Sequence, residues 1–131
     1  MITLDISRHN REKKDKVVLC YDRYAVDDSI AVLAYILESE DPSEIGDFYG
    51  DLTRNISASE GNFIALDANN APNLVKEFLR KKSYYVEEEP TYYPSGFCMY
   101  PCVTLSDKFF KECDTYDSLE KFFETKISKE G

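Results

Sequence analysis

The sequence has little of what most enzymes and membrane proteins need. Among its 131 residues there is one histidine, His9, and no tryptophan. The P-loop, GxGxxG, GxSxG and HExxH patterns do not occur. No apolar stretch approaches the roughly 18–20 residues that cross a bilayer. We therefore expect no catalytic residues, no cofactor and no membrane partner.

Cysteines in the spacing of a metal site are also missing. The four cysteines are Cys20, Cys98, Cys102 and Cys113, and no CxxC pair occurs. A zinc site would have to recruit nearly all of them, or His9, from distant segments, so we expect no metal site. The N-terminus lacks the basic and apolar regions of a signal peptide, which predicts a cytoplasmic protein with reduced thiols.

Positive charge is scarce in about one quarter of the chain. Residues 25–60 hold nine aspartates and glutamates but only one cation, Arg54, and no lysine lies between Lys16 and Lys76. This segment accounts for nearly all of the net charge of −9. Such a field repels nucleic acid and attracts basic surfaces over about 8 Å at physiological salt. We therefore expect a basic protein partner and no direct contact with nucleic acid.

Four segments have the pattern of strands. Apolar residues alternate over 2–6, and residues 17–21 are β-branched and apolar, which predicts an antiparallel pair. Residues 62–66 and 98–105 are also expected as strands. Residues 108–110 either extend the last strand or form the return strand of a hairpin.

Two segments between these strands have the pattern of helices. Residues 28–39 are apolar on nearly all sides and follow Asp27 and Asp28, which are suited to cap a helix. Apolar residues recur at helical spacing over 43–56 and predict an amphipathic helix, although Gly46 and Gly50 weaken it.

Two further helices are marked by their first residues. Pro72 fits a first helical turn, and Asp117 with Glu120 forms a capping box before the last helix. The segment 84–97 contains several prolines and is expected to be irregular. The order of elements predicts a single α+β domain over 1–131, in which a small, mainly antiparallel sheet of three to five strands is packed by about four helices.

The expected helix over 43–56 carries a row of carboxylates. Glu40, Glu44, Asp47 and Asp51 are spaced by 4, 3 and 4 residues, opposite the apolar stripe. At about 1.5 Å per residue, their spacing would be similar to that of DNA phosphates. The candidate partner-binding residues here are Glu38, Glu40, Asp41, Glu44, Asp47 and Asp51. The alternative is an ordinary solvated helix face.

A second candidate contact is rich in tyrosine. The chain has ten tyrosines, and four of them flank the acidic run 87–89. Tyrosine buries a large area at low entropy cost and is enriched at protein interfaces. We add Glu87, Glu88, Glu89, Tyr92 and Tyr93 to the partner-binding candidates. The alternative is that these rings simply cover the sheet.

Two weaker catalytic arrangements stay open. Asp22, Asp27 and Asp28 could bind Mg²⁺ for phosphoryl chemistry, although adjacent acids before a helix more often cap it. Cys20 and His9 could form a nucleophile and base pair. Neither arrangement has a motif behind it.

The combination of small size, acidity and missing catalytic motifs is typical of small phage or bacterial inhibitors. Anti-restriction, anti-CRISPR and toxin-immunity proteins have this profile. We expect a non-enzymatic inhibitor that presents its carboxylates, as a nucleic-acid mimic, to a basic nucleic-acid-binding surface of a partner protein. The alternatives are a tyrosine-rich interaction module or homodimer, and a small metal-dependent enzyme.

Overall fold

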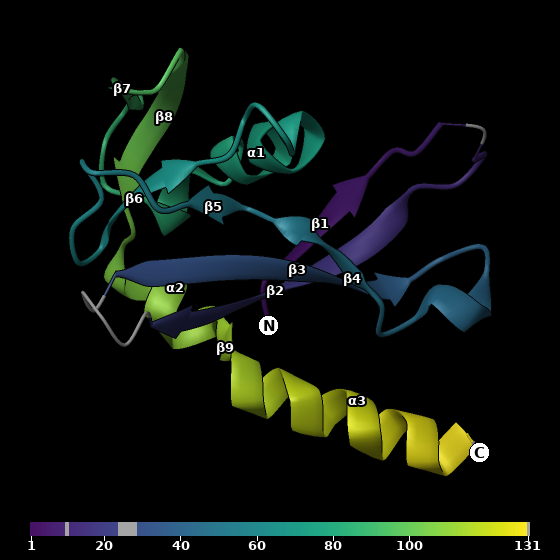
Figure 1. Cartoon of the computed structure of the whole chain (residues 1–131). Helices are drawn as coiled ribbons and strands as arrows, with labels where there is room; N and C mark the ends of the chain where they lie inside the picture. Colours follow the sequence, from purple (N-terminus) through teal and green to yellow (C-terminus); the bar gives the residue numbers. More distant parts are fainter. Residues whose placement is uncertain (10, 24–28, 131) are drawn as a thin grey trace.

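The computed structural model describes residues 1–9, 11–23 and 29–130, with the side chains of the last helix described as far as Lys126. Asp27 and Asp28, expected as helix caps or metal ligands, lie outside the described residues. Two sheets and three α-helices make up the described part (Figure 1). The helices are α1 (Pro72–Leu79), α2 (Asp107–Glu112) and α3 (Tyr116–Glu130). The expected α+β class is confirmed, with fewer helices than predicted.

The first sheet, sheet A, is built around a long strand, β2. Its strands lie in the order β1-β2-β3-β4 with antiparallel pairing, and β9 adds a short parallel pair with β2. The expected pairing of the first two strands is confirmed. The strands are β1 (Thr3–Ile6), β2 (Asp15–Arg23), β3 (Ile30–Glu38), β4 (Phe48–Asp51) and β9 (Asp114–Thr115).

The segment expected as the first helix is the central strand β3. Its side chains alternate between two cores: Ile30 and Val32 face the main core, whereas Leu33 and Tyr35 face α3. A strand covered on both faces is apolar throughout and therefore has the same all-apolar pattern as a buried helix. The helix predicted over 28–39 was wrong, and the β-branched residues in this run favoured the strand.

The segment expected as the second helix is also extended, so the helix predicted over 43–56 was wrong. After the short 3₁₀ helix η1 (Pro42–Glu44), Gly46 has a φ of +93°, which a helix excludes. The chain then pairs with β3 as β4 and passes through Leu52, whose N–H donates to the Val32 carbonyl at 2.9 Å. Tertiary pairing overrides the helical spacing, so the row of carboxylates along one helix does not form.

Sheet B has the antiparallel order β5-β6-β8-β7. The strands expected over 62–66 and 98–105 are confirmed. The segment 84–97 is less irregular than expected, because Gly96, with a φ of +62°, closes a two-residue turn between two strands. Pro94 is tolerated in β7 because this strand lies at the edge of the sheet. The elements are β5 (Thr53–Arg54), β6 (Phe63–Leu66), the 3₁₀ helix η2 (Lys82–Tyr84), β7 (Thr91–Ser95) and β8 (Cys98–Thr104).

The start of each of the helices α1 and α2 is explained by a residue in the local sequence. α1 begins at Pro72, as expected. Residues 108–110, expected to extend a strand or to form a return strand, belong instead to α2. This helix is capped by Ser106, whose hydroxyl oxygen accepts a hydrogen bond from the Phe109 N–H at 3.3 Å. The serine cap was the signal that the strand interpretation missed.

The last helix, α3, is present as expected but begins one residue earlier than the predicted cap. Thr115 occupies the capping place, because its hydroxyl oxygen accepts a hydrogen bond from the Ser118 N–H at 3.2 Å. Asp117 therefore lies in the first turn of α3, where a negative charge is favourable to the helix dipole.

Sheet A separates two cores. On one face, α1, α2 and sheet B bury a large core that includes Phe78 and Phe109. On the other face, α3 packs Leu119 and Phe123 against Val18 and Cys20. Figure 1 shows α3 on the side of sheet A opposite α1. A helix roughly 10 Å wide is narrower than four strands, which span roughly 15 Å, and this leaves part of the second face open beside α3.

Candidate functional site

Glu44, expected near the centre of the acidic row, is compensated by arginines of the β1–β2 loop. Its carboxylate accepts hydrogen bonds from Arg8 at 2.6 Å, from Arg11 at 3.0 Å and from the Ser39 hydroxyl at 2.9 Å. The Ser39 hydroxyl, followed by the two arginines, lowers the pKa of the Glu44 carboxyl. Glu44 is therefore engaged within the protein, where it joins the β1–β2 loop to the segment after β3.

Arg8 also pairs with Asp15, whose side chain is fully buried at the start of β2. The other oxygen of Asp15 has no hydrogen-bond partner among the described atoms. A buried carboxylate with a single cation depends strongly on that cation. We call this group the loop cluster; it consists of Arg8, Arg11, Asp15, Ser39 and Glu44.

Two neighbouring acids are used in the same region. The Lys13 N–H donates to the Glu40 carboxylate at 2.7 Å. Asp41 caps η1, accepting from the N–H and the hydroxyl of Ser43 at 3.0 and 2.6 Å. The hydrogen bonds from Ser43 lower the pKa of the Asp41 carboxyl. Three of the six candidate partner-binding acids in this region therefore accept hydrogen bonds from this chain, and the uncompensated row that the sequence suggested is absent.

The other three acids, Glu38, Asp47 and Asp51, are exposed. None of them forms an ion pair with another described residue. Asp51 lies directly opposite Leu33 in the register of β4 with β3, so both project from the face of sheet A that α3 covers. Burial, followed by the charge of Asp67, raises the pKa of the Asp51 carboxyl.

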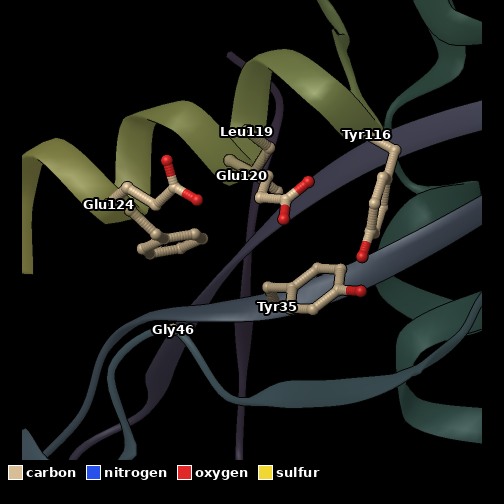
Figure 2. A pocket seen from close by; sticks show the side chains of 7 residues that line it. Tyr35, Gly46, Tyr116, Leu119, Glu120 and Glu124 are labelled. Carbon is tan, nitrogen blue, oxygen red and sulfur yellow. The ribbon is translucent and has the colours of Figure 1, made fainter.

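Beside α3, this face of sheet A opens into a cavity of about 230 Å³. Aromatic and aliphatic side chains form most of its wall, and two carboxylates of α3 lie at its rim. Figure 2 shows Glu120 and Glu124 on the helix and Tyr35 across from them on β3. We call this cavity the α3 groove; it is lined by Tyr35, Gly46, Tyr116, Leu119, Glu120, Phe123 and Glu124.

The spacing of side chains along α3 explains this arrangement. Tyr116, Glu120 and Glu124 recur every four residues and so follow one side of the helix. They lie next to Leu119 and Phe123, which pack against sheet A. The sequence analysis assigned Glu120 to a capping box and did not single out this row, although its four-residue spacing is visible in the chain.

No basic side chain is among the described residues that line the α3 groove. Its lining has only aromatic, apolar and acidic residues and one glycine. Within the described ranges, no cation forms an ion pair with Glu120 or Glu124. The two carboxylates therefore differ from that of Glu44, which is held by two arginines.

Aromatic rings continue from the groove toward the edge of sheet A. The ring of Tyr35 lies 6.4 Å from that of Tyr116 and 5.5 Å from that of Phe48. Phe48 is 52% exposed. Burial, followed by the neighbouring Tyr116, raises the pKa of the Tyr35 hydroxyl, so it keeps its proton at neutral pH. Aromatic rings at this edge of the groove are therefore accessible to a binding partner.

In the acidic run 87–89, as in the first acidic group, one part is hydrogen-bonded within the fold and the other part is exposed. Glu87 accepts hydrogen bonds from the N–H and the hydroxyl of Thr104, both at 2.8 Å, and extends the pairing along β8. Glu88 and Glu89 are exposed. Of these three candidate residues, Glu87 is therefore used within the fold, whereas the carboxylates of Glu88 and Glu89 face solvent.

The β7–β8 hairpin presents apolar side chains to solvent. Tyr93 packs edge-on against Phe63, with ring centroids 5.6 Å apart. By contrast, Tyr92 and Met99 are each 58% exposed, and Phe97 at the turn is 110% exposed. We call Tyr92, Phe97 and Met99 the hairpin patch. The sequence pointed to the tyrosines but did not single out Phe97, which ends the segment expected to be irregular, or Met99, which lies in the expected strand over 98–105.

Of the two catalytic alternatives, the Cys20–His9 pair gains no geometry from the fold, and Asp27 and Asp28 of the other lie outside the described residues. Burial, followed by the charges of Asp114 and Asp22, raises the pKa of the Cys20 thiol to about 12, which opposes formation of a nucleophilic thiolate. His9 lies in the loop at the opposite end of the β1–β2 hairpin from Cys20. In the part of the chain that the structure describes, no three His, Cys, Asp or Glu side chains are grouped to hold a metal ion.

Comparisons with known proteins leave the function to be argued from this geometry. The chain matches no family model, no curated protein and no solved structure. Among the described residues, no helix combines the length and the apolar character needed to cross a membrane.

Proposed function

We propose that the protein acts by binding a basic surface of another protein and not by catalysis. The observation that carries this proposal is the α3 groove, where Glu120 and Glu124 border an aromatic cavity with no basic residue among the described residues of its lining. Asp51 projects from the same face of sheet A. Carboxylates around an apolar centre match a partner that places basic residues around an apolar contact. The net charge of −9 adds attraction during approach.

A nucleic-acid-handling protein is the partner class that fits this surface best, because such proteins line their binding sites with lysine and arginine. By occupying that site, the protein would act as an inhibitor of the anti-restriction, anti-CRISPR or toxin-immunity kind. The contact differs from the one expected from the sequence. The carboxylates at the cavity come from α3, and Asp51 of β4 projects from the same face of sheet A, so these acids do not form a phosphate-like row along one helix.

Charge reversal at the groove tests the proposal. The tagged protein recovers its partner from a lysate of the source cells, and the association rate of the purified partner is measured at low and at high salt. The double variant Glu120→Lys and Glu124→Lys should slow association at least about tenfold at low salt, because attraction becomes repulsion. High salt should slow association of the unmodified protein, because it screens the charges.

The matched control reverses the same number of charges elsewhere. Glu12→Lys with Glu60→Lys changes the net charge equally at two exposed positions outside the groove lining. This control should keep the association rate within about twofold. Equal slowing in both double variants would show that only net charge matters, and an unchanged rate in the groove variant would contradict the proposal.

The hairpin patch supports a second candidate, an interaction module with an apolar contact. Phe97 is held fully exposed at the tip of a hairpin that is ordered by its own pairing, as expected for a ring that enters a pocket of a partner or of a second copy. In this case Phe97→Ser abolishes binding, the groove variant does not, and affinity hardly responds to salt. Light scattering distinguishes a homodimer, which would have twice the mass of one chain.

A further inference from the structure

We infer that the α3 groove receives one arginine side chain of the partner. Its guanidinium would lie between the carboxylates of Glu120 and Glu124 and the ring of Tyr35. The inference rests on the proposed function, because it assumes that the partner is a protein. It adds the identity of the side chain that enters the groove. The groove joins the three features that an arginine needs: an apolar wall, an aromatic face and carboxylate acceptors.

The two carboxylates are spaced to share one cation. Glu120 and Glu124 are four residues apart on α3, or about 6 Å along the helix axis, and both line the same cavity (Figure 2). Like charges at this spacing repel each other. A guanidinium placed between them would replace repulsion by attraction, and its five donors in one plane can serve both carboxylates.

The aromatic side chains favour a cation as well. Tyr35, Tyr116 and Phe123 all line the cavity. The negative face of such rings attracts a guanidinium within about 6 Å of the ring centre. The cavity of about 230 Å³ is smaller than the roughly 300–1,000 Å³ of pockets that enclose whole small ligands. It therefore suits one long side chain better than an entire helix or strand.

Other side chains fit less well. An acidic group would face two carboxylates without a basic residue in the lining. An apolar side chain would remove water from these carboxylates without replacing their hydrogen bonds, which is costly. Lysine carries a compact charge that does not stack on a ring as a planar guanidinium does. Arginine is the side chain whose shape and donors use every part of the groove.

A peptide titration tests this inference without the partner. The probe is acetyl-Gly-Arg-Gly-amide, and its control contains citrulline, which has nearly the same shape but no charge. Amide chemical shifts of the isotope-labelled full chain report where each peptide binds. The arginine peptide should shift Tyr35, Gly46 and Tyr116, with a Kd on the order of 1 mM, because one side chain makes few contacts. The citrulline peptide should bind roughly tenfold more weakly.

Neutral variants identify the groups responsible. Glu120→Gln with Glu124→Gln keeps the size of both side chains and should weaken binding of the arginine peptide roughly tenfold. Glu12→Gln with Glu60→Gln removes the same charge at two exposed positions outside the groove lining and should change the Kd by less than about twofold. A lysine peptide should bind several-fold more weakly than the arginine peptide.

Five results would overturn the inference. Three concern the peptides: no binding of the arginine peptide, equal binding of the citrulline peptide, and equal binding of the lysine peptide. The other two are unchanged binding in the groove variant, and concentration-dependent shifts of the same residues without peptide, which would place a second copy in the groove. The outcome is separate from that of the partner experiment. If the partner binds in a salt-dependent way but the arginine peptide does not bind, only the arginine inference is rejected. If the peptide binds but reversal of Glu120 and Glu124 leaves partner binding unchanged, the proposed function is rejected.

Discussion

The loop cluster and the α3 groove both contain glutamates, but they use them in opposite ways. In the loop cluster, Glu44 forms ion pairs with Arg8 and Arg11, and these pairs link two segments of the chain. In the α3 groove, Glu120 and Glu124 lie beside aromatic rings in a lining that has no basic residue. The first arrangement stabilises the fold, and the second leaves charge for a partner.

This contrast shows why the density of charge in a sequence does not locate a binding surface. The most acidic quarter of the chain supplies Glu40, Asp41 and Glu44, all of which accept hydrogen bonds from this chain. The groove acids come from α3, where acidic and basic residues are mixed. Availability depends on which cations the fold brings near each carboxylate, and the β1–β2 loop brings its arginines to only one of the two regions.

The largest expected effect is that of removing the cation of the loop cluster. Arg8→Ala leaves Asp15, whose side chain is fully buried, without its ion-pair partner. We expect the free energy of unfolding to fall by about 3 kcal/mol, measured by urea denaturation. Lys121→Ala on the exposed side of α3 is the matched control and should change stability by less than about 0.5 kcal/mol.

A second variant separates loss of the pair from general damage to the loop. Asp15→Asn added to Arg8→Ala removes the unpaired charge and should restore part of the lost stability. A loss below about 1 kcal/mol in Arg8→Ala would show that the loop cluster contributes little. The contrast with the groove would then fail.

The next effect is a difference in pH dependence between Glu44 and Asp51. The pKa of Glu44 is lowered by folding, so its contribution is present at neutral pH and is lost as the pH falls below the ordinary value of 4.5. Glu44→Gln should therefore destabilise the protein at neutral pH and have little effect in acid. Unfolding measured across this range tests the prediction.

Asp51 should behave in the opposite sense. Its pKa is raised by folding, so its ionised form is unfavourable in the folded state above the ordinary value of 3.8. Asp51→Asn should therefore increase stability at neutral pH, and this gain should vanish in acid. Parallel pH profiles for the two variants would contradict the distinction between compensated and available carboxylates.

The smallest expected effect concerns the groove acids themselves. Glu120→Gln with Glu124→Gln relieves a like-charge pair on α3 and should raise the free energy of unfolding by about 0.3 kcal/mol. Urea denaturation at low salt measures it, and added salt should erase the difference. A clear loss of stability would mean that these carboxylates have favourable partners in the fold, as Glu44 does.

Much of the fold follows from local patterns in the sequence. Alternation over 2–6, the β-branched run at 17–21 and the proline at the start of α1 all predicted the elements that are present. The failures concern β3 and β4. A strand buried on both faces has no alternation to detect, and the helical spacing around Gly46 is accidental because that residue has a positive φ.

The candidate site was harder to predict, because it depends on long-range neighbours. The sequence identified Asp47 and Asp51, which are exposed, as candidate partner-binding residues. It could not show that Arg8 would reach Glu44, since 36 residues separate them. Nor could it show that Tyr35 would face α3, because residue 35 was expected on a helix.

The most direct test compares the carboxylates of the two regions in one titration. Side-chain carboxyl carbon shifts of Glu44, Glu120 and Glu124 are followed as acetyl-Gly-Arg-Gly-amide is added to the labelled protein. We predict that the carboxyl carbon signals of Glu120 and Glu124 shift together to saturation, while the signal of Glu44 stays unchanged. Shifts of Glu44 equal to those of the groove acids, or no shift of Glu120 and Glu124, would contradict it.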